Sequence, residues 1–234
     1  DPGLYFESSI PEGYGVGSSG ALIAALYEQY TRNKVAVEQV NNEKLLELKK
    51  QFAQLESFYH GTSSGIDPLN SYLKHPLLFG ENKSIEKVDI HLPTKNPEFA
   101  VFLINSGKQG KTGPLVNIFL EKTKKKNGNG IDSMHLNNVT NQAIQSIIKG
   151  NNQNFFESLK ELSSYQLKHF DPMIPEGFRS IWRKGLEQDS YYLKLCGSGG
   201  GGFLLGFTDD FPTVRRNLEK KDMEIIPVYV HLLP

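Results

Sequence analysis

The sequence predicts a two-layer α+β protein. Apolar residues recur at helical spacing in several long segments, and short apolar runs bounded by glycine or polar loops are typical of buried strands. Because helices separate these strands along the chain, we expect helices layered on a sheet rather than an all-helical or all-β fold. The 234 residues, of which 38% are hydrophobic, are enough for one large domain or two small ones.

The first part of the chain is predicted to alternate polar loops with helices. We expect a strand at residues 4–10, helices at 21–30 and 42–57, a loop at 60–68, and short strands at 77–79 and 88–92. A strand that begins so near residue 1 needs neighbours, so we expect an earlier segment of the fold to precede it. Linker-like composition at residues 93–97 predicts a domain boundary, which gives domains of residues 1–95 and 96–234.

The second part is predicted to return to alternating strands and helices. A buried strand at 99–104 precedes a glycine-containing loop at 105–114 and a helix that runs to about residue 124. Helices are expected at 131–149, 154–169, 175–188 and 212–220, and strands at 191–196, 203–207 and 224–231.

Charge and cysteine content narrow the function classes. Lys plus Arg and Asp plus Glu number 26 each, so no overall field attracts nucleic acid or an anionic membrane. The one cysteine, Cys196, excludes an internal disulfide and favours a reducing cytoplasm. No apolar run approaches the ~20 residues of a membrane helix. We therefore expect a small-molecule substrate and neither a nucleic-acid nor a membrane partner; whether the chain forms a homodimer stays open.

A glycine-rich stretch, Pro11 to Ser19, leads directly into the first helix. Glycines let backbone N–H groups approach a phosphate closely, and a helix start adds unpaired donors and a positive dipole end. The stretch lacks the ending of a Walker loop and the spacing of a Rossmann fingerprint. The alternative is a tight turn in which Ser18 or Ser19 caps the helix.

Two acidic residues flank a second Ser/Gly loop. Glu56 closes a helix and Asp67 follows eleven residues later. Phosphoryl transfer needs a carboxylate for Mg²⁺ and another near the nucleophilic hydroxyl. The alternative is that Glu56 is a surface charge and Asp67 caps the next helix.

Four consecutive glycines, residues 199–202, separate two predicted strands. A hairpin turn needs only two residues with positive φ, so this run exceeds that requirement. We expect a loop that passes close to a ligand or to another backbone; an ordinary hairpin is the alternative.

Together these segments resemble the GHMP kinase superfamily. The stretch Pro11 to Ser19 is similar to that family's second motif, Pro-x-Gly-x-Gly-Leu-Gly-Ser-Ser, and Lys194 to Gly202 is similar to its third, Lys-Leu-Thr-Gly-Ala-Gly-Gly-Gly-Gly. Within the family, His60 to Asp67 is closest to the mevalonate kinases, whose pattern is His-Gly-x-Pro-Ser-Gly-x-Asp. The segment from Asn105 to Thr112 resembles their substrate-side loop.

The resemblance implies a fold, cofactors and roles. The fold would combine a ribosomal protein S5 domain 2-like N-terminal part, here incomplete, with a ferredoxin-like C-terminal α/β sandwich; the cofactors would be ATP and Mg²⁺. Asp67 would be the catalytic base, or at least orient the substrate hydroxyl. The implied nucleotide-binding residues are Gly13, Gly15, Gly17, Ser18, Ser19, Gly199, Gly200 and Gly201; the Mg²⁺ ligands are Ser19 and Glu56; the substrate residues are His60, Gly61, Ser64 and Thr112. For His60, a structural role in the loop is the alternative.

The implied reaction is 5-phosphorylation of mevalonate, a step of isoprenoid precursor synthesis. Two positions depart from the mevalonate kinase pattern: Ser63 replaces the usual Pro and Pro68 the usual Asn. The family's first motif and its N-terminal Lys do not occur in this sequence. The alternatives are therefore a related kinase acting on a sugar or phosphomevalonate, or a truncated fragment that binds nucleotide without turnover.

Overall fold

The computed structural model describes residues 3, 5–80, 84–93, 98–110, 112–124 and 130–230. The chain divides into two units, Asp1–Glu12 with Gly17–Asp89 and Gly13–Val16 with Ile90–Pro234. The change of unit after Asp89 lies near the linker predicted at 93–97; residues 94–97 are outside the described residues, and the two predicted domains stay a prediction. Within the described residues, no helix combines the length and apolar character that crossing a membrane requires.

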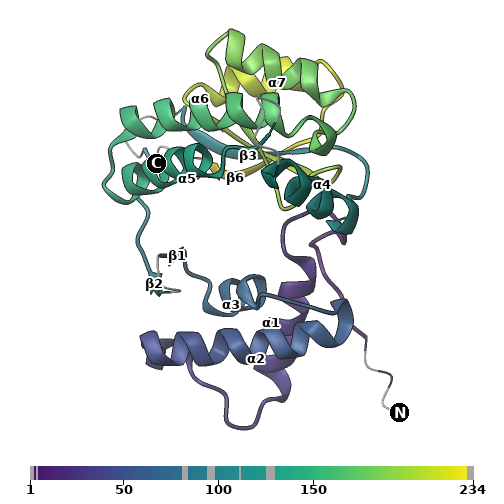
Figure 1. Ribbon diagram of the computed structural model, residues 1–234, viewed down its shortest axis with the longest axis vertical. Helices are drawn as coiled ribbons and strands as arrows, with labels where there is room; N and C mark the ends of the chain where they lie inside the picture. The colour runs from purple at the N-terminus through teal and green to yellow at the C-terminus, as the bar shows by residue number, and fades with distance from the viewer. Residues whose placement is uncertain are drawn as a thin grey trace. The chain divides into compact units, whose positions relative to one another are not determined.

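The first unit is built on three helices. Its elements are α1 (Ser18–Tyr30), a 3₁₀ turn η1 (Val37–Gln39), α2 (Asn42–His60), α3 (Ile66–Leu73), β1 (Leu77–Phe79) and β2 (Ile85–Lys87) (Figure 1). The helices enclose an aromatic core in which the rings of Tyr27, Phe52 and Tyr72 lie 4.9–5.6 Å apart. This core holds α1, α2 and α3 together, which fixes the residues at their ends.

Three expectations for the first unit are wrong. Residues 5–10 form no strand, because no strand of the described chain pairs with them; Tyr5 is 88% exposed. The strand expected at 88–92 is instead β2, since the chain leaves the hairpin after Lys87 and the His91 N–H bonds Ile147 O at 2.9 Å. The loop expected at 60–68 ends early, because α3 begins at Ile66 and holds Asp67 and Pro68 in its first turn, where a proline is tolerated.

The second unit contains an antiparallel sheet with helices on both sides. Its elements are β3 (Ala100–Asn105), α4 (Thr112–Lys124), α5 (Ser133–Ile148), α6 (Asn152–His169), η3 (Asp171–Met173), α7 (Phe178–Glu187), β4 (Tyr192–Leu195), β5 (Phe203–Thr208), α8 (Phe211–Glu219) and β6 (Ile225–Val230) (Figure 1). The strand order is β4-β5-β3-β6. This is the order of a ferredoxin-like sandwich with extra helices between its first two strands, as the resemblance implied.

Alternation along β3 supplies both faces of this sheet. Phe102 and Ile104 belong to one core with Trp182 of α7 and Val214 of α8. Phe99 and Val101 belong to another core with side chains of α5 and α6. Because successive strand residues point to opposite faces, an apolar strand such as β3 predicts burial on both sides.

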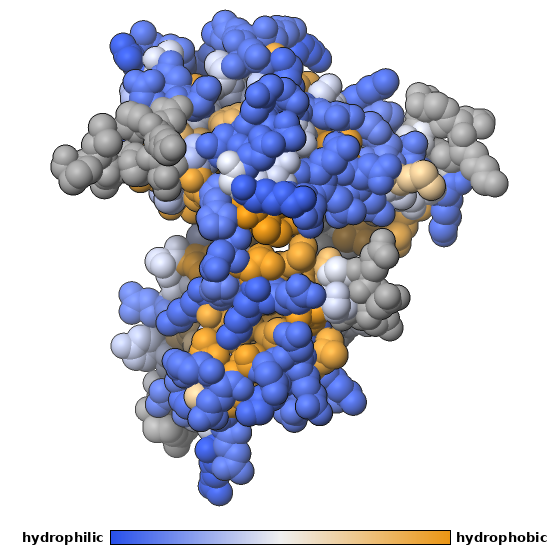
Figure 2. All heavy atoms as spheres, turned by 90° about the vertical axis from the view of Figure 1, so that its left-hand side faces the viewer, coloured by the Kyte–Doolittle hydropathy of each residue, from blue (hydrophilic) through white to orange (hydrophobic). Residues whose placement is uncertain are grey.

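The outer surface carries both hydrophilic and hydrophobic residues. On the face drawn in Figure 2, hydrophilic residues cover much of the surface, and hydrophobic residues gather on the first unit. Phe58 of α2 is 85% exposed and Phe79 of β1 is 41% exposed. Exposed apolar residues are common on folded domains and define no site by themselves.

Candidate active site

Helix α1 begins without a side-chain cap. Gly17, the residue before the helix, has the left-handed conformation with φ of 78°. No side chain of the described residues caps the helix. The first turn also carries no acidic residue. The N–H groups of that turn therefore lack side-chain acceptors, and no acidic residue of the turn itself interacts with the positive end of the helix dipole. Such a terminus is suited to an anion.

A buried carboxylate lies beside this terminus. Ser19 Oγ donates to Glu56 Oε1 at 2.8 Å. Ser63 Oγ donates to the other oxygen, Glu56 Oε2. Glu56 is only 8% exposed, so it is not the surface charge that the alternative interpretation required. Both oxygens of a buried carboxylate are thus hydrogen-bonded, as buried polar groups generally are.

The second acidic residue, Asp67, lies in the first turn of α3. Gly65, the N-cap residue of this helix, has the left-handed conformation with φ of 71°, and its N–H donates to Ser63 Oγ at 3.0 Å. Burial raises the pKa of the Asp67 carboxyl above the ordinary value of 3.8, and the charge of Glu56 raises it further. The side chain keeps contact with solvent, which limits this rise. A carboxylate so placed is a better proton acceptor than a fully solvated one.

Close packing of α1 against α3 places Asp67 next to the start of α1. A Cβ atom added at Gly20 would lie 2.7 Å from the backbone carbonyl carbon and the Cβ of Asp67. A Cβ at Gly17 would lie 3.8 Å from Asp67 Cβ. The uncapped helix terminus, the Ser19–Glu56 pair and Asp67 therefore come together inside the first unit.

The predicted substrate residues are divided between the units. Gly61 ends α2, and its N–H donates to Ser57 O at 3.0 Å. Ser64 lies in the same loop, where its hydroxyl accepts from the Ile66 N–H at 3.3 Å. His60 is the last residue of α2, and Thr112 is the first residue of α4 in the second unit. The side chains of both residues are outside what the structure describes. Their contact with a substrate stays a prediction.

In the second unit, backbone hydrogen bonds join the first glycine segment to the loop after β3 and to the start of β5. The Gly110 N–H donates to Gly13 O at 2.9 Å, and the Phe203 N–H donates to Tyr14 O at 3.1 Å. The rings of Tyr14 and Phe203 lie 5.0 Å apart. Gly13 and Gly15 thus lie next to the loop that contains Gly199, Gly200 and Gly201.

The run of four glycines is explained by the close approach of other backbone segments. A Cβ at Gly202, where φ is +72°, would lie 2.4 Å from Tyr14 O. A Cβ at Gly201 would lie 2.6 Å from the backbone of Gln109. The expectation of a loop against another backbone is confirmed, whereas contact of these glycines with a nucleotide stays a prediction.

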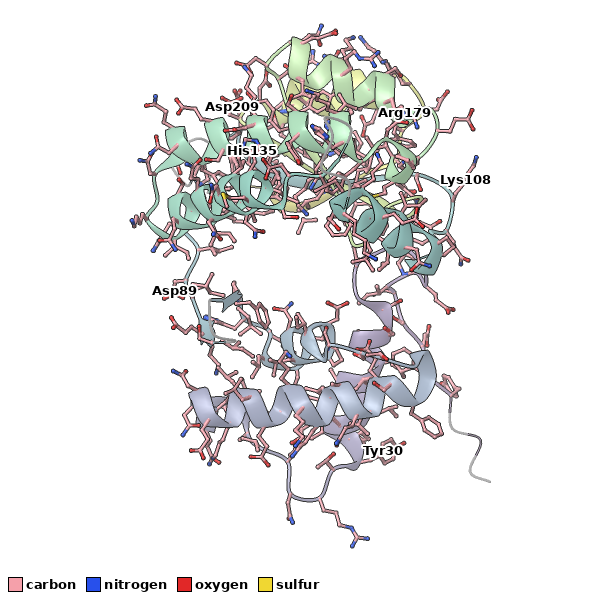
Figure 3. The ribbon with its side chains drawn as sticks, in the orientation of Figure 1. Tyr30, Asp89, Lys108, His135, Arg179 and Asp209 are labelled. Carbon is pink, nitrogen blue, oxygen red and sulfur yellow. The ribbon has the colours of Figure 1, made fainter. Side chains whose placement is uncertain are left out.

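The loop after β3 is exposed. Asn105 Nδ2 donates to Glu224 Oε2 at 2.6 Å, and the Gly107 N–H donates to Asn105 Oδ1 at 2.7 Å. These bonds hold the start of the loop, while the Lys108 side chain projects away from the sheet (Figure 3). Lys108 is therefore solvated in this structure.

Ser19 and Glu56 fit a magnesium ion that also binds phosphate. In the described part of the chain, no three His, Cys, Asp or Glu side chains come together as a metal cluster. Mg²⁺ commonly takes one or two protein carboxylates and completes its shell with water and phosphate oxygens. Glu56 and the Ser19 hydroxyl supply hard oxygen donors of this kind, so the pair fits a nucleotide-bound Mg²⁺ better than a separate metal centre.

A groove on the second unit contains none of the predicted site residues. Its volume is about 720 Å³, and it lies over α6 with residues of α5 and α7 at its edges. His135, labelled in Figure 3, lines it and lies 3.4 Å from Glu161, measured from Nε2 to Oε1. The groove carries side chains of both charges and adds no residue to the candidate site.

Sequence reasoning missed two residues of the site. Ser63 was noted only as a departure from a family pattern, yet it bonds Glu56. The helix expected from residue 21 begins at Ser18, so Gly20 lies inside α1, where it packs against α3. A glycine inside a helix costs about 1 kcal/mol relative to alanine, so its presence was a signal of close packing.

Comparison with known proteins reveals relatives that share this sequence or fold. The family described as GHMP kinases N terminal domain matches residues 3–74. A mevalonate kinase of Archaeoglobus fulgidus is 28% identical over 211 residues, which are 87% of this chain and 64% of that protein. The chain therefore spans slightly less than two thirds of the length of that relative.

Solved structures match nearly the whole chain. Lactococcus lactis galactokinase complexed with galactose has a TM-score of 0.64 and 14% identity, covering 96% of this chain and 68% of that one. L. major mevalonate kinase in complex with R-mevalonate has a TM-score of 0.63 and 17% identity, with coverages of 92% and 67%. Streptococcus pneumoniae phosphomevalonate kinase with phosphomevalonate and AMPPNP has a TM-score of 0.67 and 17% identity, with coverages of 94% and 71%. At such identities the likeness shows the fold alone.

Proposed function

We propose that this chain, which belongs to the GHMP kinase superfamily, is part of a kinase that transfers the γ-phosphate of ATP to a hydroxyl group of mevalonate. The observation that carries the proposal is the arrangement of Ser19, Glu56 and Asp67 at the uncapped start of α1. Each of these groups suits one requirement of phosphoryl transfer: binding of phosphate, binding of Mg²⁺ and orientation of the attacking hydroxyl.

In this proposal the start of α1 binds the phosphates of ATP. The backbone N–H groups of its first turn would donate to phosphate oxygens, and the helix dipole would favour their charge. Ser19 and Glu56 would hold the Mg²⁺ that accompanies ATP, and this ion would neutralise charge on the phosphate oxygens as the bond to the leaving group breaks. The other predicted nucleotide residues, Gly13, Gly15 and Gly199–Gly201, belong to the second unit and stay a prediction.

Asp67 would act on the acceptor. Its carboxylate would accept a hydrogen bond from the acceptor hydroxyl and orient the oxygen toward the γ-phosphorus. A bond forms between that oxygen and the γ-phosphorus, the bond from the γ-phosphorus to the bridging oxygen of ADP breaks, and the hydroxyl proton passes to Asp67. An aspartate is a weak base at neutral pH, which is acceptable because a loose transition state depends mainly on positioning and electrostatics.

Mevalonate is the favoured acceptor on two grounds. The segment from His60 to Asp67 resembles the mevalonate kinase pattern, and the curated relative is a mevalonate kinase. Galactokinase and phosphomevalonate kinase structures share the fold to a similar degree, so a sugar or phosphomevalonate is the second candidate acceptor.

An assay of ADP release with a panel of acceptors tests this proposal. Mevalonate, phosphomevalonate, galactose and homoserine would each be supplied with ATP and Mg²⁺, both to this chain and to the protein as its gene encodes it. We expect turnover with mevalonate. Turnover with only one of the other acceptors would make that compound the proposed acceptor in place of mevalonate. No ADP release with any acceptor, combined with retained ATP binding, would favour a nucleotide-binding role without phosphoryl transfer.

A further inference from the structure

We propose that Ser63 is a positioning residue that fixes both acidic groups of the site, Glu56 directly and Asp67 through the start of α3. This inference rests on the proposed function for its kinetic consequences, but the hydrogen bonds that carry it lie within the first unit. No sequence pattern assigned a role to Ser63.

The hydrogen bonds of Ser63 have a fixed direction. A serine hydroxyl has one proton and two lone pairs. The carboxylate of Glu56 can only accept, and the Gly65 N–H can only donate, at 3.0 Å to Ser63 Oγ. The Ser63 proton must therefore go to Glu56, and a lone pair of Ser63 takes the Gly65 N–H. The Ser63 N–H in turn donates to Ser57 Oγ at 3.0 Å, which ties the loop to α2.

The hydrogen bond from Ser63 helps to fix the plane of the Glu56 carboxylate. Ser19 and Ser63 each hold one oxygen of this buried group. Because the Ser19 proton is committed to Glu56, the lone pairs of Ser19 Oγ stay available to a cation. Loss of the Ser63 hydroxyl would leave one carboxylate oxygen without a donor in a buried position, so Glu56 would rotate or draw in water.

The hydrogen bond from the Gly65 N–H to Ser63 fixes the start of α3, the helix that carries Asp67. Ser63 accepts the N–H of Gly65, the N-cap residue of α3, and Asp67 follows two residues later. A Cβ at Gly65 would lie 2.1 Å from Lys49 O, so the loop is pressed against α2. From the other side, Gly20 of α1 contacts the Asp67 backbone. Ser63 is therefore the side chain that links the carboxylate of α2 to the start of α3.

The test compares an isosteric pair, Ser63→Thr and Ser63→Val, since threonine keeps the hydroxyl and valine lacks it. Ser71→Ala, on α3 but outside this hydrogen-bond set, is the control. The readouts are the Mg²⁺ concentration for half-maximal turnover and the binding of Mg²⁺·ATP by calorimetry. Partners of metal ligands commonly change metal affinity 10–100-fold when removed. We expect Ser63→Val to raise the Mg²⁺ requirement at least tenfold, and Ser63→Thr to stay within about threefold of the wild type.

A double-mutant cycle separates positioning from a general structural role. If Ser63 acts through Glu56, Ser63→Val should weaken Mg²⁺·ATP binding in the wild type and leave it unchanged in the Glu56→Gln background. In Tm, which is measurable without substrate, we expect partial non-additivity: Ser63→Val should cost less in the Glu56→Gln background, although the hydrogen bond from the Gly65 N–H is lost in both backgrounds. Additive effects in both readouts, or a Ser63→Val protein indistinguishable from the control, would overturn the inference. Absence of turnover in the wild type would instead refute the kinase proposal. The double-mutant cycle measured by Tm would still test whether Ser63 acts through Glu56.

Discussion

At the scale of single residues, the site depends on two carboxylates in different surroundings. Glu56 is buried and accepts two hydroxyl hydrogen bonds. Asp67 keeps contact with solvent, and burial and the neighbouring Glu56 charge raise its pKa. Two acidic groups whose surroundings differ in this way are suited to different tasks, one to hold a cation and one to accept a proton.

The pKa of Asp67 should fall when the charge of Glu56 is removed. We expect Glu56→Gln to shift the titration of the Asp67 carboxyl carbon, followed by ¹³C NMR, to lower pH, because one of the two causes of the raised pKa is then absent. Glu47→Gln, an exposed position on the same helix, should leave the titration unchanged. An unchanged titration in Glu56→Gln would refute the electrostatic link between the two residues. In the wild type, kcat/KM should fall as pH decreases through this raised pKa.

Asp67→Asn should lower kcat and raise stability at neutral pH. Loss of a general base typically costs 10²–10⁴-fold in rate, while nucleotide binding should persist. The folded-state pKa of Asp67 lies above its unfolded value, so ionisation of Asp67 opposes folding as pH rises through that pKa. Since solvent screens Asp67, we expect only a small gain in the free energy of unfolding at pH 7, and this gain should vanish below the ordinary aspartate pKa of ~3.8. Denaturant titrations of the wild type and Asp67→Asn, at pH 7 and below the ordinary aspartate pKa of ~3.8, measure this difference in the free energy of unfolding. Asp89→Asn is the control.

The order of Glu56, the Ser/Gly loop and Asp67 along the chain left a bland alternative open for each residue, and the resemblance to the mevalonate kinase pattern selected them as candidates. Ser63 could not be found in the same way, because its role depends on which atoms of Glu56 and Gly65 lie within hydrogen-bonding distance. Tertiary contacts of this kind leave no local pattern in a sequence.

At the scale of elements, the packing of α1 on α3 sets the distance between the uncapped start of α1 and Asp67. Gly20 permits this packing because it has no side chain. Helix propensity alone predicts that Gly20→Ala stabilises the protein by about 1 kcal/mol. The steric contact predicts the opposite, since a Cβ would lie 2.7 Å from the Asp67 backbone, closer than carbon atoms tolerate.

We expect the steric effect to dominate at Gly20. Gly20→Ala should destabilise the protein by about 1–3 kcal/mol, as overpacking generally does, and should lower kcat because α3 must move. Chemical denaturation checks the stability. Gly113→Ala is the matched control, because a Cβ there meets no atom within 4 Å. A stability gain in Gly20→Ala would show that α1 and α3 lie farther apart than described.

Helix periodicity predicted most elements, including α5, α6 and α7, because each buries one apolar face. It failed at α3, where a proline at position 68 argued for a loop and the helix has only eight residues. The strand expected at 4–10 failed for the opposite reason: aromatic residues favour a strand, but a strand forms only where a partner pairs with it.

At the scale of the whole molecule, the match to the family model lies in the first third of the chain. The family match covers residues 3–74, which contain Ser19, Glu56, Ser63 and Asp67. The second unit has a ferredoxin-like strand order, and its likeness to the solved structures concerns the fold alone. Glycines that a sequence motif associates with nucleotide binding also allow backbone segments to approach in the second unit, so both roles must be tested separately.

Transfer of labelled phosphate tests the central claim most directly. The protein as its gene encodes it would be incubated with γ-labelled ATP, Mg²⁺ and mevalonate, and the label recovered in the acceptor would be measured for the wild type, Asp67→Asn and Asp89→Asn. We predict labelled phosphomevalonate from the wild type and from Asp89→Asn, and at least a hundredfold less from Asp67→Asn. Equal transfer by Asp67→Asn and the wild type would contradict the assignment of this site.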